Sequence, residues 1–314
     1  MATPSQIFNE KSKFLDKREA LLKRKVTTAE RKLLNVIIDK FVDKLDVSGG
    51  VIQNNDKNIK ITQGIQKIFE EFDKQVNAKL IEEYGDDILK GQALNETYFS
   101  TFDIDKKKFG NIKNDVRSTT NRRLGISSTG KVVKGGFLDN FIGDSTVKTQ
   151  VQQLATEVIT GESSRKDALN RLKRIVVGDA EVSGQLQNQY RTFIYDTYAE
   201  VDALESDLYA NAIGLESAFY LGGTIKTTRR FCCQRNGNLY TVKEINAWNS
   251  LTWKGKKPGV PTLIQRGGYN CRHRLRYISN KVAVTERRDL TLSSTGKLIK
   301  NGGASQKYNS GCDK

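Results

Sequence analysis

Apolar residues recur three or four positions apart along the first two thirds of the chain, the spacing that places them on one face of a helix. Residues 1–48 are expected to be helical, and a capping box at 27–30 precedes an apolar stripe at Leu34, Ile37, Phe41 and Leu45. The Ser48-Gly49-Gly50 turn is expected to end this helical region. A second stripe runs from Ile61 to Leu80, and the polar run 85–87 predicts its end. Both stripes are typical of helices that bury one face in a core.

The helical pattern strengthens from Val147. It breaks at Gly161, restarts at the capping sequence Ser164-x-x-Asp167, and keeps helical spacing again from Leu186 onward. Two successive helices of this kind predict an antiparallel pair that supports the residues after it.

After Gly223 the pattern changes to short β-prone runs divided by Gly, Asn and Pro. The Asn236-Gly237 dipeptide is typical of a hairpin turn, here between Phe231 and Leu239. The expected strands are 224–227, 239–242, 262–264 and 274–278, with one small helix at 242–248.

These patterns predict an α+β protein whose N-terminal two thirds are mainly helical and whose small C-terminal domain is α+β. The expected parts are a helical region 1–144 with a short β-hairpin near 126–136, a helical pair 145–216, a compact α+β domain 217–280, and a hairpin with a flexible tail at 281–314.

Residues Gly125 to Lys131 match the first seven positions of a phosphate-binding P-loop, G-x-x-x-x-G-K. We reject that interpretation because Val132 replaces the hydroxyl residue, no apolar strand precedes the glycine, and two glycines stand where a helix should begin. The string SSTGK of residues 127–131 returns at 293–297, each time before two apolar residues and a lysine. A Thr-Gly turn between short apolar runs predicts two small hairpins.

Charge changes this picture, because it is unevenly distributed. The whole chain carries +16, and residues 217–314 hold 19 Lys and Arg against four acidic residues, a balance of +15. A segment so poor in acidic residues is expected to attract a polyanion, and we favour double-stranded DNA as that partner. A generally basic, solvated surface would give the same balance of charged residues. No run is long and apolar enough for a membrane helix and the N-terminus lacks a signal-peptide core, so we expect synthesis in the cytoplasm and no membrane partner.

Residues 228–277 concentrate the candidate chemistry: three of the four cysteines, the single histidine and both tryptophans. Cys232 or Cys233 with Cys271 and His273 would suit Zn²⁺, but a fourth ligand is missing unless both neighbouring cysteines bind or Cys312 returns. We prefer the alternative that these are buried core residues without a cofactor, and we expect reduced thiols.

An enzyme is not expected from this inventory. A nuclease would need metal-binding carboxylates, and residues 217–280 contain only Glu244. A nucleophilic pair of Cys232 and His273 would lack an orienting acid. Trp248, Trp253 and Tyr269 could stack on bases, but such aromatics are more often the core of a small domain.

The pattern TRRFCCQRNGNLYTVKEINAW, a Lys/Gly/Pro-rich loop and then GGYNCRH resembles the C-terminal domain of the Mu F-like head-morphogenesis family, the minor head proteins of tailed bacteriophages. The resemblance covers about residues 145–280, including the pair Arg191-Thr192. Its motif residues are Cys232, Gly237, Trp248, Cys271 and His273. The commoner form has His-Pro before the last cysteine, whereas this chain has Gly268-Tyr269-Asn270, which removes one metal ligand.

The resemblance implies a minor structural protein of the virion, made in the host cytoplasm, that associates with portal and capsid proteins during head assembly and contacts packaged DNA. Its phosphate contacts are expected among the basic residues of the C-terminal domain, namely Arg229, Arg230, Lys254, Lys256, Lys257, Arg272, Arg274 and Arg276. The alternatives are a zinc-containing, nuclease-like enzyme acting on nucleic acid and a DNA-binding protein injected with the genome.

Overall fold

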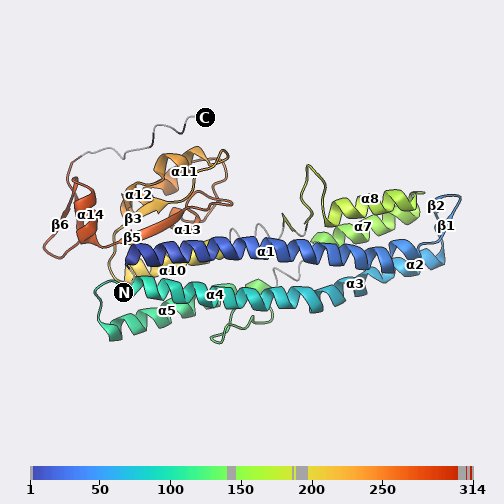
Figure 1. The fold of residues 1–314 in the computed structure, drawn as a ribbon, viewed down its shortest axis with the longest axis horizontal. Coiled ribbons are helices and arrows are strands. Elements are labelled where there is room, and N and C mark those ends of the chain that lie inside the picture. Colours follow the sequence, from blue (N-terminus) through green and yellow to red (C-terminus); the bar gives the residue numbers. More distant parts are fainter. Residues whose placement is uncertain are drawn as a thin grey trace. The chain divides into compact units, whose positions relative to one another are not determined.

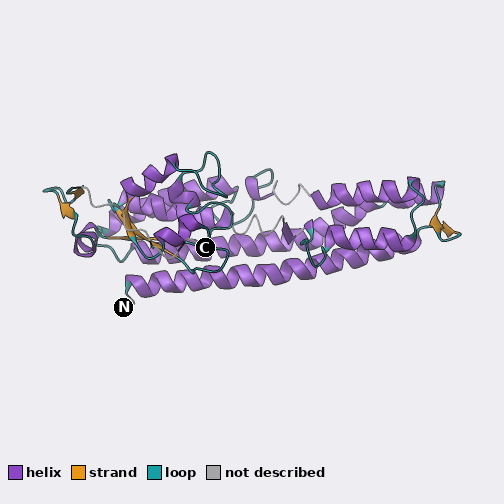
Figure 2. Cartoon of the chain, turned by 90° about the horizontal axis from the view of Figure 1, so that it is seen from above, coloured by secondary structure: helices purple, strands orange, loops and turns teal. Residues whose placement is uncertain are grey.

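The computed structural model describes residues 3–139, 146–185, 187–188 and 197–302, together with Asn309 and Cys312. It is a mainly helical α+β structure with small antiparallel sheets, as predicted (Figures 1 and 2). The helices are α1 (Pro4–Lys40), η1 (Val42–Lys44), α2 (Asp56–Gln63), α3 (Ile65–Phe72), the π-helical η2 (Asp73–Asn77), α4 (Ala78–Phe99), α5 (Lys106–Leu124), α7 (Thr146–Thr160), α8 (Arg165–Val176), α10 (Ala199–Ala212), α11 (Arg230–Arg235), α12 (Val242–Ala247), η4 (Trp248–Ser250), α13 (Thr262–Gln265) and α14 (Asn280–Glu286). The strands are β1 (Val47–Ser48), β2 (Val51–Ile52), β3 (Ser217–Leu221), β4 (Leu239–Thr241), β5 (Arg274–Ile278), β6 (Leu290–Leu292) and β7 (Leu298–Lys300).

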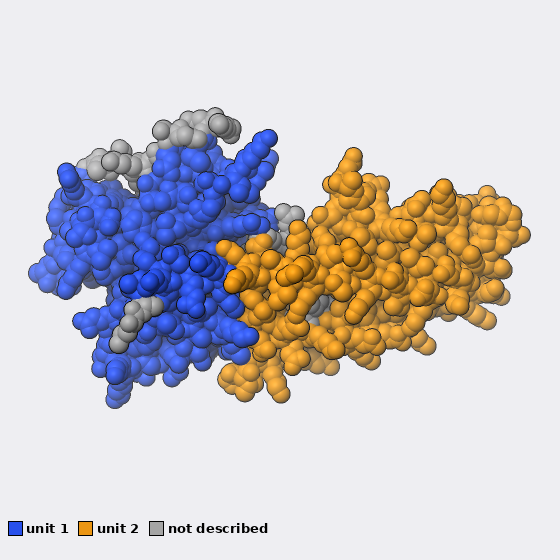
Figure 3. All heavy atoms as spheres, viewed as in Figure 1, with its two compact units in different colours: residues 1–15, 88–122, 192–314 blue, residues 16–87, 123–191 orange. Residues whose placement is uncertain are grey.

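The chain folds into two compact units that do not follow the sequence in order (Figure 3). Unit 1 consists of residues 1–15, 88–122 and 192–314, and unit 2 of residues 16–87 and 123–191. This division differs from the consecutive parts expected from the sequence, because the helices α1 and α4 each contribute residues to both units. Among the described residues, no helix combines the length and the apolar character needed to cross a bilayer.

In unit 2, two expected helix boundaries are wrong. The capping box at 27–30 starts nothing, because α1 runs through it and the hydroxyls of Thr27 and Thr28 donate to carbonyls four residues earlier. The helix expected to stop at 85–87 continues as α4, where Asp87 forms an ion pair with Arg18. The polar residues that resemble a boundary have partners within α1 in the first case and on a neighbouring helix in the second, so the helix continues. The cap at Ser164 is confirmed, since its side chain accepts from the Asp167 backbone.

The two SSTGK segments adopt the same turn. In each, the serine backbone N–H donates to the lysine carbonyl at 2.8 Å, and the glycine has a positive φ, 82° at Gly130 and 77° at Gly296. The second copy joins the paired strands β6 and β7, so that hairpin is confirmed. The first forms a single bridge between Ile126 and Val132 rather than a two-stranded hairpin.

The β4-β3-β5 sheet organises the C-terminal part of unit 1, with both edge strands antiparallel to β3. Strands β4 and β5 and helix α12 match the prediction. The central strand β3 was missed, and the strand expected at 224–227 is absent from the described residues. Residues expected to extend as strands, 262–264 and those around Phe231, form the helices α13 and α11, so Asn236-Gly237 joins a helix to β4 and not two strands.

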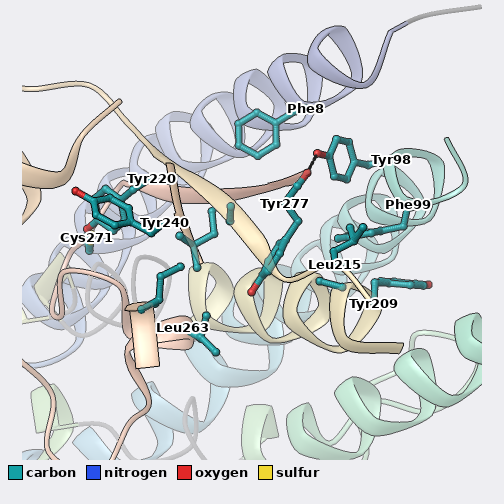
Figure 4. Packing of buried hydrophobic residues seen from close by; sticks show 14 of the residues in the cluster. Phe8, Tyr98, Phe99, Tyr209, Leu215, Tyr220, Tyr240, Leu263, Cys271 and Tyr277 are labelled. Atoms are coloured by element: carbon teal, nitrogen blue, oxygen red, sulfur yellow. Dashed lines mark hydrogen bonds between the residues drawn. The ribbon is translucent and has the colours of Figure 1, made fainter. Parts of the chain in front are cut away.

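One face of this sheet is packed with aromatic side chains that also come from α1, α4 and α10 (Figure 4). Phe99 stacks on Tyr209 with ring centroids 5.0 Å apart, and the hydroxyl of Tyr98 donates to the Tyr277 carbonyl. A smaller cluster of Leu239, Ala283 and Leu290 joins β4 to α14 and β6. Segments distant in sequence therefore share the core that holds the sheet.

The expectation of reduced thiols is wrong for two cysteines, because Cys233 and Cys312 form a disulfide. Asn309 also attaches to α11 by donating its side-chain N–H groups to the Cys233 and Asn236 carbonyls. Residues 303–308 of the expected flexible tail lie outside the described residues, as do residues 186 and 189–196 of the helix expected from Leu186, a gap that includes Arg191 and Thr192. The later part of that helix is confirmed as α10.

A buried polar network links the helices of unit 1. Lys11 forms an ion pair with Asp202 at 2.7 Å and donates to Asn95, and Asn95 in turn donates to Asp202 and Glu205. Thr120 donates to the other oxygen of Glu205. Burial, reinforced by the nearby Asp202 charge, raises the pKa of Glu205 to about 7. Although burial opposes it, the Lys11 ammonium holds the pKa of Asp202 below its ordinary value.

The network makes stability depend on pH through Glu205. Its folded-state pKa is about 7 against an ordinary 4.5, so the folded state binds the extra proton between these values and stability falls as pH rises through this window. Glu205→Gln removes the titrating carboxyl and with it the loss of stability at high pH. Relative to the wild type, the free energy of unfolding of the variant should rise by up to about 3 kcal/mol between pH 4.5 and 8. Urea unfolding of both proteins at several pH values measures the difference, and a difference independent of pH would contradict the assignment.

Candidate functional site

Cys232, Cys271 and His273 meet beside the central strand, and each offers one ligand atom within 4.8 Å of the others. Cys232 lies on α11, while Cys271 and His273 lie in the turn that leads into β5. The two Sγ atoms are 3.9 Å apart, and Nδ1 of His273 is 3.9 Å from the Cys271 Sγ. The structure thus brings together three of the four candidate ligands.

Two glycines allow this close approach. A Cβ on Gly267 would lie 2.1 Å from the Cys232 Sγ and 2.9 Å from the Cys271 Sγ, and a Cβ on Gly222 would lie 2.7 Å from the His273 ring. Neither glycine has a positive φ, so it is the space beside the sulfurs and the imidazole, rather than backbone strain, that excludes a side chain here.

Tyr220 of β3 completes the cluster and was not predicted. Its hydroxyl donates to the Cys232 Sγ at 3.3 Å and lies 3.8 Å from the Cys271 Sγ, and its ring stacks on His273 (Figure 4 shows Tyr220 and Cys271). The Gly267 N–H donates to the Cys271 Sγ at 3.2 Å. Tyr220 thus reaches both sulfurs from the buried face of the central strand.

The two thiols differ in their electrostatics. The hydrogen bond from Cys232 lowers the pKa of Cys271 well below its ordinary value against the opposing effect of burial, and His273 and Arg266 add to the shift. The same hydrogen bond and burial raise the pKa of Cys232. Negative charge is therefore more favourable on Cys271 than on Cys232, because the hydrogen bond from Cys232 and the nearby Arg266 guanidinium stabilise it.

Cys233 does not belong to the cluster, which corrects the candidate ligand set. The disulfide to Cys312 occupies both residues. These were the two sources of a fourth ligand considered from the sequence, and neither is available while the disulfide is intact. The sequence contains no sign of this pairing, because the two cysteines are 79 residues apart.

Both tryptophans belong to the core rather than to a base-stacking surface. Trp248 packs edge-on against Tyr220, Phe231 and Tyr240. Trp253 stacks on Phe231 with centroids 3.9 Å apart and donates to the Gly267 carbonyl. Of the three aromatic candidates Tyr269 is the exposed one. Gly237 has a φ of 81°, which explains the glycine at that motif position.

Three segments that carry predicted phosphate contacts meet at one corner. Arg229 donates to the Tyr269 carbonyl and lies against Gly255, whose own carbonyl accepts from the Tyr269 N–H. The start of α11, the 253–257 loop and the 268–272 turn are thereby joined. We call the basic residues of these segments the basic corner; they are Arg229, Arg230, Lys254, Lys256 and Arg272.

The other predicted contacts lie elsewhere. Lys257 is buried and forms an ion pair with Glu200 at 2.5 Å, so its assignment as a phosphate contact is wrong. Arg274 and Arg276 point away from the buried face of β5, and Arg276 lies over the Phe219 ring and donates to Ser5. Within the basic corner itself, Lys256 donates hydrogen bonds to the carbonyls of Asn249 and Leu251.

Glu244, the single carboxylate of residues 217–280, has a structural role. It completes a capping box with Thr241 and pairs with Arg287 and Lys300. Although burial alone would raise it, these partners lower the pKa of Glu244 to about 2. Its oxygens accept from the Thr241 N–H and pair with Arg287 and Lys300, which weakens the nuclease alternative.

A substitution at Gly267 tests how closely Cys232, Cys271 and Tyr220 pack around this glycine. Gly267→Ala should lower the melting temperature, because its Cβ overlaps the Cys232 sulfur, at a cost of about 1–3 kcal/mol. Gly223→Ala is the matched control, because its Cβ meets nothing within 4 Å, and it should change stability by less than about 0.5 kcal/mol. Equal thermal melting curves for the two variants would contradict the close packing.

Compared with protein-family models, with curated proteins and with solved structures, the chain matches none of them. The resemblance to minor head proteins therefore depends on the quoted motifs, and the function follows as a proposal.

Proposed function

We propose that this protein is a minor structural head protein of a tailed bacteriophage whose C-terminal part contacts packaged double-stranded DNA without sequence specificity. The proposed DNA contact is supported by the distribution of charge. Residues 217–314 have a net charge of +15, while the other 216 residues are nearly neutral. The motif resemblance over about residues 145–280 supports the structural role in the head.

The basic corner is the surface through which this contact would be made. Arg230, Lys254 and Arg272 are exposed, and the joined loops bring them close to Arg229. Lysine and arginine side chains in such an arrangement contact phosphates and release counterions, which gives binding that weakens steeply with salt and reads no bases.

Association with portal and capsid proteins, in the virion and in the host cytoplasm during assembly, is the other half of the proposal. It depends on the resemblance alone. A portal gene beside the gene for this chain is expected. Co-expression of the two products followed by affinity purification should recover them together, and failure to recover a complex would count against this half.

The DNA contact is tested with the full chain and a labelled duplex of arbitrary sequence. Replacing Arg230, Lys254 and Arg272 by alanine should weaken binding at low salt and reduce the slope of log K against log salt by about 2–3, since each phosphate contact contributes about 0.9. Fluorescence anisotropy across a salt series measures both quantities.

The matched control replaces three exposed lysines of unit 2, Lys44, Lys60 and Lys67, and changes the net charge by the same amount. Its affinity and salt slope should stay much closer to those of the wild type. Equal losses in both triple variants would show that net charge and not the basic corner controls binding, and a wild type that binds no duplex at low salt would refute the DNA contact.

A further inference from the structure

Four heteroatoms from three separate elements face a common point between α11, β3 and β5. The geometry points to a metal site: one divalent, borderline-soft ion, Zn²⁺ in the cell, held by the Sγ atoms of Cys232 and Cys271 and by Nδ1 of His273, with the Tyr220 hydroxyl at the fourth position. Among the described residues, this is the one group of His, Cys and acidic side chains that clusters closely enough to hold an ion. The inference does not depend on DNA binding or on a phage origin.

The spacing of the ligand atoms fits a tetrahedral ion. Zn²⁺ binds thiolates at about 2.3 Å and imidazole at about 2.0 Å, so a tetrahedron places two sulfurs about 3.8 Å apart and a sulfur and a nitrogen about 3.6 Å apart. Two of the corresponding distances are 3.9 Å, and the Cys232 Sγ and the His273 ligand atom lie within 4.8 Å of each other. Side-chain adjustments of roughly 1 Å or less would therefore bring these atoms to the bonding positions.

Tyr220 supplies the fourth ligand, which the sequence analysis did not identify. A phenol oxygen bound at about 2.0 Å would lie about 3.5 Å from each sulfur of the same tetrahedron. The Tyr220 hydroxyl lies 3.3 Å and 3.8 Å from the two sulfurs. It comes from the central strand, which is 12 residues from Cys232 and 51 from Cys271 in sequence, so no local motif could reveal it.

The surroundings are those of a structural site rather than a catalytic one. All four side chains are buried, which leaves no open position for a substrate. The Gly267 N–H donates to the Cys271 sulfur, an outer hydrogen bond of the kind that orients a metal thiolate, and the absence of a Cβ at Gly267 leaves the sulfurs their space. An ion here would fasten the short helix α11 to two strands of the sheet.

The first experiment measures metal in the full-length protein, produced with Zn²⁺ in the medium and purified under reductant without chelator. Elemental analysis should find about one Zn²⁺ per chain, and Cys271→Ser should lose it, because three of the four ligands are then too few for tight structural binding. The matched control is the double variant Cys233→Ser, Cys312→Ser, which removes the other two cysteines and should retain the metal.

A second measurement avoids the risk that a ligand variant does not fold. Co²⁺ added to the reduced, metal-free wild type should produce thiolate-to-metal charge-transfer bands in the near ultraviolet and the strong visible bands of tetrahedral cobalt. Tyr220→Phe keeps both thiolates, so its charge-transfer bands should remain while the visible bands change.

Three results would overturn the site. One is a wild type that takes up neither Zn²⁺ nor Co²⁺ with its thiols reduced. Another is a Cys271→Ser variant with the metal content of the wild type. The last is a peptide map of the purified protein showing Cys232 bonded to Cys271 as a disulfide, which would assign the close approach of the two sulfurs to a redox pair.

Discussion

The buried hydroxyl of Tyr220 is the constraint on which the C-terminal half of unit 1 depends. The residue is fully buried in the central strand, and a buried hydroxyl needs a partner or costs about 1–3 kcal/mol. Its available partners are two sulfurs, so α11 and the turn before β5 must both approach β3 closely. The missing Cβ atoms of Gly222 and Gly267 leave room for that approach, and Trp248 packs edge-on against the Tyr220 ring.

Much of the fold could be predicted from local pattern, and the failures share a cause. The stripes at helical spacing, strand β5 and the short helix α12 are properties of neighbouring residues, and they were found. Strand β3 was missed because it is central, packed on both faces and paired on both edges, so it lacks the alternation of a half-exposed strand. The false helix start at 27–30 shows the converse, since Glu30 accepts from Gln187, a partner 157 residues away.

In the candidate site, too, residues recognisable from the sequence were found, and residues that depend on tertiary contacts were missed. Cys232, Cys271 and His273 were identified because their chemistry is visible in the sequence, whereas Tyr220 and Gly267 matter only through where other elements place them. Counting charges identified a basic segment but could not tell that Lys257 is paired with Glu200, 57 residues earlier. Which cations have internal partners is a property of the tertiary structure.

The disulfide has a consequence for the topology of the C-terminal part. Joining Cys233 to Cys312 closes a covalent ring that contains the two edge strands, β4 and β5, while the central strand β3 lies outside it. Closing a loop of this length removes roughly 4–5 kcal/mol of chain entropy from the unfolded state. Because β3 lies outside the ring and pairs with both edge strands, the sheet ties residues 217–221 to the segment that the disulfide closes.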